Sequence, residues 1–277
     1  MMKHFKVTYL ICFSLLSPFA AHAVELCGQL AQGELIRGQA ENAEQIFLDD
    51  SQLELTKDGT FLFALERDAK KTATLQIAGS DNVDSYPLEI APTEWDIQKI
   101  NGVPPRKVEP TEKDLHKINI EREDLQRALS YHTSTSNWQK GFIMPVKGRT
   151  SGHFGGQRIM NGKPRAPHRG MDIAAEEGAE VYASSDGIVT LSGGNYFYTG
   201  NVVVIDHGQN LSTIYAHLKD TTVKKGQKVK QGDVIGHVGK TGRATGPHLH
   251  WGASVNNIRF QPLSLLKLKD NSFCSHL

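Results

Sequence analysis

Short apolar or alternating segments dominate the first part of the chain and predict β-strands. The segments 34–38, 45–49 and 60–64 either alternate between apolar and polar residues or are apolar nearly throughout. Turn residues separate them, and the Asp-Gly pair at 58–59, between two apolar segments, is a typical hairpin signal. We therefore expect residues 24–104 to form a small, sandwich-like β module that carries no catalytic residues.

A stiff linker and a helix are expected after this module. The two prolines at 104–105 favour extended backbone. From Thr111 onward the pattern becomes helical, and Asp114 stands three residues after Thr111, as in a helix N-cap. Four apolar residues then recur at roughly helical spacing: Leu115, Ile118, Leu125 and Leu129. The segment is heavily charged, so we assign residues 105–140 to a linker with a mostly solvated helix that packs through one stripe.

Glycine becomes frequent from residue 141 onward, and the apolar segments stay short. Strands are expected at 187–191, 201–206, 212–217, 233–237 and 248–251. Many short strands separated by glycine turns, with little helical pattern, indicate an antiparallel β core. The fold class is therefore mainly β, with a second domain over residues 141–268 and a C-terminal tail over residues 269–277.

The composition of the 277-residue chain is that of a packed globular protein. Hydrophobic residues make up 39% and charged residues 22% of the sequence, which does not suit a disordered chain. The formal net charge is +1, so bulk charge gives no support for a nucleic-acid partner.

The first 23 residues have the pattern of a secretion signal. Lys3 and Lys6 form a short basic start, and the apolar segment 7–19 is too short to span a bilayer comfortably. The small residues at 21–23 fit a cleavage site, which would place the mature start at Val24. We expect a signal peptide over residues 1–23 and no stable membrane insertion.

Two cysteines remain after removal of this segment. Cys12 lies in the signal and is lost with it, whereas Cys27 and Cys274 lie near the two ends of the mature chain. Cysteine pairs in exported proteins favour disulfides, so we predict a Cys27–Cys274 bond; the alternative that the sequence leaves open is two unpaired thiols.

Histidines in the second domain suggest a metal site. His248 and His250 lie two residues apart in a predicted strand, so their side chains point to the same face. One imidazole can bind a metal while the other handles a proton. His168 and Asp172 are too far apart on a straight strand to share one ion, but Gly170 between them permits a local bend.

Catalytic zinc commonly has three protein ligands and one open position, and His168, Asp172 and His250 supply such a set. Two neutral imidazoles and one carboxylate leave the ion with a net positive charge, which polarises a carbonyl and lowers the pKa of bound water. His217 and His248 then remain. One of them can accept the proton of this water, and the other can hydrogen-bond the oxyanion as it forms.

Together these residues resemble the M23 family of zinc metallopeptidases, the lysostaphin-like peptidoglycan endopeptidases. The similarity extends over about residues 141–268 and includes the His-x-x-x-Asp of 168–172, the Tyr-Ala-His-Leu of 215–218, the turn and strand of 225–236 and the His-Leu-His of 248–250. The resemblance implies zinc bound by His168, Asp172 and His250, with His217 and His248 catalytic and His248 as the usual base. It also implies a two-sheet, mostly antiparallel β domain with an open groove.

The resemblance further implies hydrolysis of peptide cross-links, with the peptide stems of peptidoglycan as the partner. The N-terminal module and helix resemble, more loosely, accessory regions of exported members from bacteria with a periplasm. We therefore expect a secreted, periplasmic enzyme. The sequence leaves open which cross-link is cut. The alternative function is a non-catalytic, wall-binding regulator of an amidase, although all five site positions are filled here.

Two features carry alternative interpretations. The aromatic residues 196–198 form either a hairpin tip or a groove wall for a stem peptide. Residues 24–140 either make a regulatory contact with the catalytic groove and restrain it, or dock the enzyme to the wall or to a partner. His153, His207 and His237 are expected to be structural or exposed.

Overall fold

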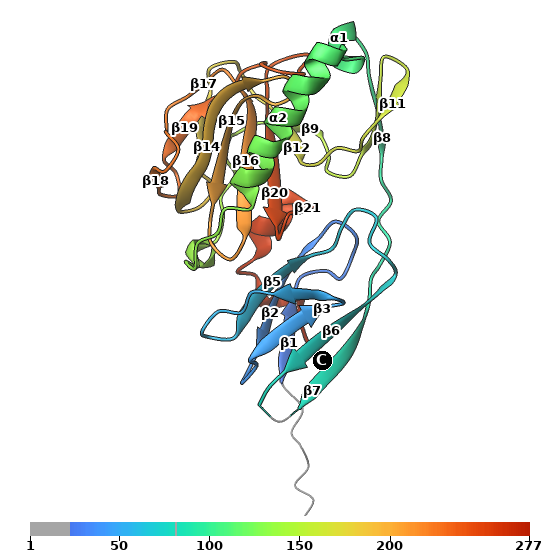
Figure 1. Cartoon of the computed structure of the whole chain (residues 1–277), viewed down its shortest axis with the longest axis vertical. Coiled ribbons are helices and arrows are strands. Elements are labelled where there is room, and N and C mark those ends of the chain that lie inside the picture. Colours follow the sequence, from blue (N-terminus) through green and yellow to red (C-terminus); the bar gives the residue numbers. More distant parts are fainter. Residues whose placement is uncertain (1–22, 81) are drawn as a thin grey trace, which may run out of the picture.

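Antiparallel β-sheets form most of the computed structural model, which describes residues 23–80 and 82–277 (Figure 1). A small β module occupies one end of the molecule, and a larger β domain with one long helix occupies the other. This arrangement confirms the predicted mainly β fold class. The predicted signal peptide lies outside the described residues, apart from Ala23. Within the described residues, no helix is long and apolar enough to cross a membrane.

The N-terminal module is a sandwich of two four-stranded antiparallel sheets. The first sheet has the order β22 (Cys274–His276), β1 (Val24–Cys27), β2 (Leu35–Ala40) and β5 (Thr60–Ala64). The second has the order β4 (Ser51–Leu53), β3 (Gln45–Leu48), β6 (Thr72–Ala78) and β7 (Val83–Glu89). Alternating apolar side chains from both sheets share one core, to which Ile36, Ile46, Phe61 and Leu75 contribute.

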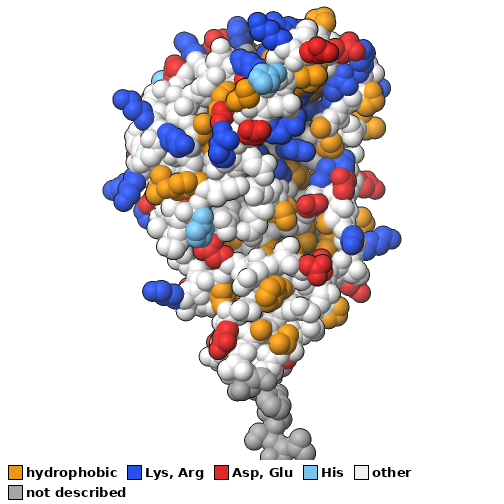
Figure 2. All heavy atoms as spheres, in the orientation of Figure 1, with side chains coloured by type: hydrophobic (Ala, Val, Ile, Leu, Met, Phe, Trp, Pro, Cys, Tyr) orange, Lys and Arg blue, Asp and Glu red, His pale blue; other side chains and the backbone are white. Residues whose placement is uncertain are grey.

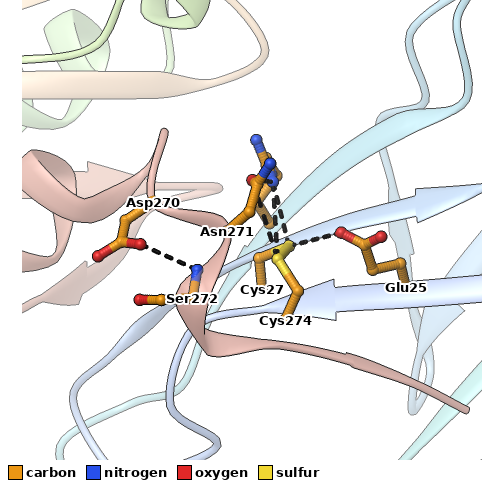
Figure 3. Close-up of a disulfide and its surroundings, with 7 residues drawn as sticks. Glu25, Cys27, Asp270, Asn271, Ser272 and Cys274 are labelled. Atoms are coloured by element: carbon orange, nitrogen blue, oxygen red, sulfur yellow. Dashed lines mark hydrogen bonds between the residues drawn. A yellow bond between two sulfur atoms is a disulfide. The ribbon is translucent and has the colours of Figure 1, made fainter.

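The chain end completes the first of these sheets. Strand β22 pairs with β1, and Cys27 lies directly opposite Cys274. The two sulfur atoms form a disulfide, which Figure 3 shows between β1 and the C-terminal strand. The predicted Cys27–Cys274 bond is thus confirmed. The predicted C-terminal tail is a structural part of the N-terminal module, because it supplies an edge strand.

The segment over residues 96–140, called the linker from here on, contains a strand and two helices. Strand β8 (Ile97–Ile100) precedes α1 (Pro105–Val108) and α2 (Glu112–Leu129). A reciprocal capping box begins α2: the Asp114 amide donates to the Thr111 hydroxyl at 3.3 Å, and the Asp114 carboxylate accepts from the Thr111 amide at 3.1 Å. Figure 2 shows charged side chains over this side of the molecule, as the charged sequence predicts. The other face of α2 packs Ala128 and Leu129 onto the main sheet.

The larger domain is organised around one long antiparallel sheet. Its order is β18 (Lys228–Val229), β14 (Gly187–Tyr196), β15 (Gly200–Asp206), β16 (Leu211–Leu218), β20 (His248–Val255), β12 (Met171–Ala174) and β9 (Arg149–Gly152), with β21 (Ile258–Phe260) beside β20. A smaller sheet has the order β13 (Glu180–Tyr182), β19 (Val234–His237) and β17 (Asp220–Thr221). Short 3-10 helices span Asn137–Lys140, Pro262–Lys267 and Asn271–Phe273.

The core of this domain includes residues from outside it. Side chains of β12, β16 and β20, among them Ile173, Tyr215 and Trp251, are fully or almost fully buried there. Trp138 of the linker packs into the same core, as do Leu35 and Leu62 of the N-terminal module. Residues 24–140 therefore contribute directly to the packing of the larger domain.

A third small sheet joins the linker to the larger domain. Strand β10 (Gln157–Met160) pairs with β11 (Lys163–Arg165) on one side and, in parallel, with β8 on the other. Trp95, just before β8, packs its ring edge-to-face on Phe154, with 5.8 Å between centroids. The linker strand thus lies against the segment that leads into His168.

Candidate metal centre

Strand pairing brings two of the three predicted ligands together. Asp172 on β12 lies directly opposite His250 on β20, and the register is regular over four residue pairs. As a result, Asp172 Oδ1 lies 2.9 Å from His250 Nδ1. His248 precedes His250 by two residues on the same strand, and its Nε2 atom lies 3.8 Å from the same carboxylate oxygen. The two imidazoles therefore share a face of β20, as the His-x-His spacing predicts.

His168 reaches the same point from the bend before β12. Its Nδ1 donates to the His153 carbonyl at 2.9 Å, which leaves the lone pair of the neutral ring on Nε2. This Nε2 lies 3.0 Å from Asp172 Oδ1 and 2.9 Å from His250 Nδ1. The structure thus places one donor atom from each of His168, Asp172 and His250 in a single cluster.

Gly170 makes the convergence possible by its small size. A Cβ atom at this position would lie 2.6 Å from the Trp251 carbonyl oxygen and 2.7 Å from His250 Nε2. The chain bends at residues 169–170, between His168 and the start of β12. Any side chain at residue 170 would push the bend away from β20, so the glycine serves close approach rather than an unusual backbone angle.

Burial and hydrogen bonding set the charge of the three groups. Burial opposes ionisation of Asp172, but its interactions with the neighbouring His168 and His250 rings outweigh this effect and hold the pKa of the carboxyl well below its usual range. Burial lowers the pKa of His168, and it lowers the pKa of His250 to about 4. At neutral pH the site therefore offers two neutral imidazoles and one carboxylate, which is the ligand set of a divalent metal such as zinc.

An arginine outside the predicted set orients the carboxylate. The Arg158 guanidinium, on β10, donates to Asp172 Oδ2, so that Oδ1 faces the histidines. Arg158 Nε also donates to Gln98 Oε1 on β8 at 3.4 Å. Sequence reasoning missed Arg158, because it belongs to no motif and only the pairing of β10 brings it to the site. Hydrogen bonds to a ligating side chain fix its orientation toward the metal.

His217 lies beside the cluster on β16. Its Nδ1 donates to the Thr241 carbonyl at 2.9 Å, and its backbone has a positive φ of 64°, unusual for a residue other than glycine. Burial, reinforced by His248 and His250, lowers the pKa of His217 well below its usual value. The ring is therefore neutral, with its lone pair on Nε2.

His248 completes the group from β20, the strand that also carries His250. Its Nδ1 donates to the Gly246 carbonyl at 2.8 Å, which again leaves Nε2 free. The centroids of the His217 and His248 rings lie 4.7 Å apart, and those of His217 and His250 lie 5.9 Å apart. Two imidazoles that do not belong to the three-donor cluster thus stand next to it, and each can accept a proton at Nε2.

His153, His207 and His237, which the sequence predicts to be structural or exposed, lie outside the cluster. His207 is fully buried and bonds the Asp186 carbonyl at 2.6 Å and the Thr213 hydroxyl at 2.7 Å. His237 lies 2.6 Å from an Asp220 carboxylate oxygen. The His153 side chain is exposed, and only its carbonyl serves the site through His168.

An antiparallel β domain with a two-imidazole, one-carboxylate cluster and two adjacent histidines has the features of a metallopeptidase. Residues 166–262 match the model of peptidase family M23, and this domain belongs to that family. The chain is similar to the peptidoglycan DD-endopeptidase ShyA of Vibrio cholerae, with 42% identity over 146 residues, which are 52% of this chain and 31% of ShyA. It is also similar to the DD-carboxypeptidase/endopeptidase Mpg of Neisseria meningitidis, with 46% identity over 35% of this chain and 22% of Mpg.

These matches cover less than a third of the relatives' own length. A solved structure matches more of the fold. A Pseudomonas aeruginosa protein, provisionally described as peptidase M23, superposes with a TM-score of 0.67 and 25% identity. The match covers 86% of this chain and 95% of that protein. The fold of the N-terminal module, linker and larger domain together thus has a counterpart among known structures.

Proposed function

We propose that this chain is an exported zinc endopeptidase that hydrolyses peptide cross-links in peptidoglycan. The observation that carries the proposal is the convergence of His168 Nε2, Asp172 Oδ1 and His250 Nδ1, with His217 and His248 beside them. The M23 match and the peptidoglycan endopeptidases among the relatives support the substrate class.

The role of each of the five residues follows from which of its side-chain nitrogen or oxygen atoms can bind a metal or a proton. Zinc held by His168, Asp172 and His250 would supply the Lewis acidity that polarises the scissile carbonyl. His217 and His248 are each held at Nδ1 by a backbone carbonyl, so each ring can exchange a proton only at Nε2. One ring accepts the proton of the attacking water, and a ring that has gained a proton can donate to the oxyanion or to the leaving amine.

The proposed location is the periplasm. The signal-like pattern of residues 1–23 supports export, and the Cys27–Cys274 disulfide suits an oxidising compartment. The filled histidine and aspartate positions favour this enzymatic function over a metal-free regulatory role.

The test is digestion of purified, cross-linked muropeptides by the zinc-loaded protein, with mass analysis of the products. The expected result is conversion of dimers to monomers, its loss on chelation and its recovery when zinc returns. The His248→Ala variant serves as the matched inactive control. Zinc-loaded, folded protein that leaves every cross-linked muropeptide intact would overturn the proposal.

A further inference from the structure

Arg243 lies in the loop that connects β19 to β20, five residues before His248. The same loop supplies the Thr241 carbonyl that holds His217. The Arg243 guanidinium carbon lies 4.3 Å from the centroid of the Tyr198 ring, and the Arg243 amide donates to the Tyr198 carbonyl at 2.8 Å. Both the main chain and the side chain of Arg243 are therefore fixed against Tyr198, in the same loop that holds His217.

The Arg243 guanidinium has no counter-ion within residues 23–80 and 82–277. Its side chain contacts the Tyr198 ring, and it forms neither a hydrogen bond nor an ion pair with another described residue. Burial lowers the pKa of Arg243, and the charges of Arg158 and Arg165 add to that effect. A partly buried cation among like charges is costly unless an anion joins it.

The neighbouring arginines leave positive charge in excess. Arg158 and Arg165 are direct cross-strand partners on β10 and β11, an unfavourable pairing of like charges. Arg158 is neutralised by Asp172, but among the described residues the Arg165 guanidinium bonds only to the carbonyls of Pro164 and Val108. The Arg165 Nε atom is buried without a hydrogen-bond partner.

Arg243 packs on an aromatic segment, residues 196–198. They join β14 to β15, so the segment is a hairpin tip, and the His217 amide donates to the Thr199 carbonyl at 2.8 Å. Phe197 packs edge-to-face against Tyr198 at 5.0 Å, and Lys107 Nζ lies 3.9 Å from the Phe197 ring centroid. Phe197 and Lys107 therefore stabilise the tip, which carries Tyr198 and the arginine stacked on it beside the site.

We propose that Arg243, held on Tyr198, binds a carboxylate of the substrate peptide close to the scissile bond. This inference rests on the proposed function and adds a specificity determinant to it. The substrate class is a peptide whose free carboxylate lies near the bond that is cut. A guanidinium binds a carboxylate through two parallel hydrogen bonds, whereas a carboxamide at the same place offers only one acceptor oxygen and no charge.

The test measures binding separately from hydrolysis. Zinc-loaded protein is titrated with a stem peptide, and with versions of the same peptide in which each carboxylate in turn is a carboxamide. Wild-type protein should lose about 10- to 100-fold in affinity for one of the amidated peptides, the range for a hydrogen bond between charged groups. Arg243→Gln should bind all versions alike, with zinc content unchanged, and Arg243→Lys should recover part of the discrimination.

Arg122→Gln is the matched control, since it removes one exposed arginine on α2 without touching the site. If Arg243→Gln discriminates as strongly as the wild type, Arg243 only packs the loop and the inference is wrong. If that same variant still cleaves cross-linked muropeptides and still prefers the carboxylate peptide over its carboxamide version, the proposed function remains intact. Absence of both binding and cleavage in the wild type would instead reject the proposed function itself.

Discussion

Asp172 and His250 are cross-strand partners, and 2.9 Å separates Oδ1 of the one from Nδ1 of the other. The candidate metal centre therefore depends on the register between β12 and β20. A slip of one residue would turn either side chain to the opposite face of the sheet. The buried side chains of Ile173 and Leu249, themselves cross-strand partners, stabilise this register by packing into the core.

Removing a ligand should remove the metal. His168→Ala, Asp172→Ala or His250→Ala should each lower zinc content and abolish hydrolysis, because the remaining two donors bind weakly. His217→Ala and His248→Ala should keep most of the zinc and still lose activity. Elemental analysis of purified variants, alongside muropeptide digestion, measures both. Zinc loss in the 217 and 248 variants, with zinc retained in the 168 variant, would reverse the assignment.

Arg158 should affect metal affinity without being a ligand. In Arg158→Gln the Asp172 carboxylate loses the bond to Oδ2 that orients it, so zinc affinity should fall by about tenfold or more. Arg158→Lys should recover part of this loss. Competition with a chelator of known affinity gives the measurement, and the exposed Arg149→Gln on β9 is the control. Equal zinc affinity in Arg158→Gln and wild type would show that the ion pair does not position the ligand.

The disulfide should stabilise the whole chain. It joins β1 to β22 across 247 residues of sequence, so it restricts the unfolded chain strongly. Replacement of Cys27 and Cys274 by serine should lower the free energy of unfolding by about 2–4 kcal/mol. Urea unfolding of the double variant and of the oxidised wild type provides the comparison. Two freely alkylatable thiols in native, folded protein would contradict the bond.

Stability should fall in mild acid through His207. Full burial lowers the pKa of His207 to about 4, whereas the ring in the unfolded chain titrates near 6.5. Between these values the unfolded state binds the extra proton, so stability present above about pH 6.5 is lost as the pH falls toward 4. From pH 7 to pH 5 the contribution of this residue is about 2 kcal/mol.

His207→Asn, although less stable overall, should therefore show a correspondingly smaller loss between the two pH values. The experiment is urea unfolding of zinc-loaded protein at each pH, with the exposed His116→Asn of α2 as control. If the free energy of unfolding of His207→Asn depends on pH as strongly as that of the wild type, the His207 ring is not buried in its neutral form.

The linker strand should restrain the site. Strand β8 pairs with β10, and Gln98 contacts the Arg158 that holds Asp172. Trp95→Ala removes the ring that packs on Phe154 and should loosen this strand. If β8 limits the access of substrate to the site, turnover of soluble muropeptides should rise severalfold, whereas loss of the Gln98 contact with Arg158 alone would lower it. Ile97→Ala, a change at an exposed position of β8, is the matched control. Equal turnover in both variants and wild type would favour a docking role for the N-terminal part. Deletion of residues 24–140 is the poorer test, since it also removes Trp138 from the core.

The sequence by itself determined the elements that depend on local pattern. Period-two alternation and glycine turns predicted the bounds of six strands to within a few residues: β2, β3, β5, β15, β16 and β19. The same pattern predicted where β14 and β20 begin, but both strands extend further than expected. The Thr111 and Asp114 pair located the start of α2, because capping is a local hydrogen-bond exchange. The His-x-His spacing predicted two imidazoles on one face, since side-chain direction in a strand alternates with every residue.

Only the tertiary structure decided which distant groups meet. Asp172 faces His250 because β12 and β20 are neighbours in register, and Arg158 reaches Asp172 because β10 is held between β8 and β11. Arg243 meets Tyr198 through a contact between two loops. The free energy of such pairings comes from burial and hydrogen bonds between segments far apart in the chain, and no local pattern records which partner each segment will find.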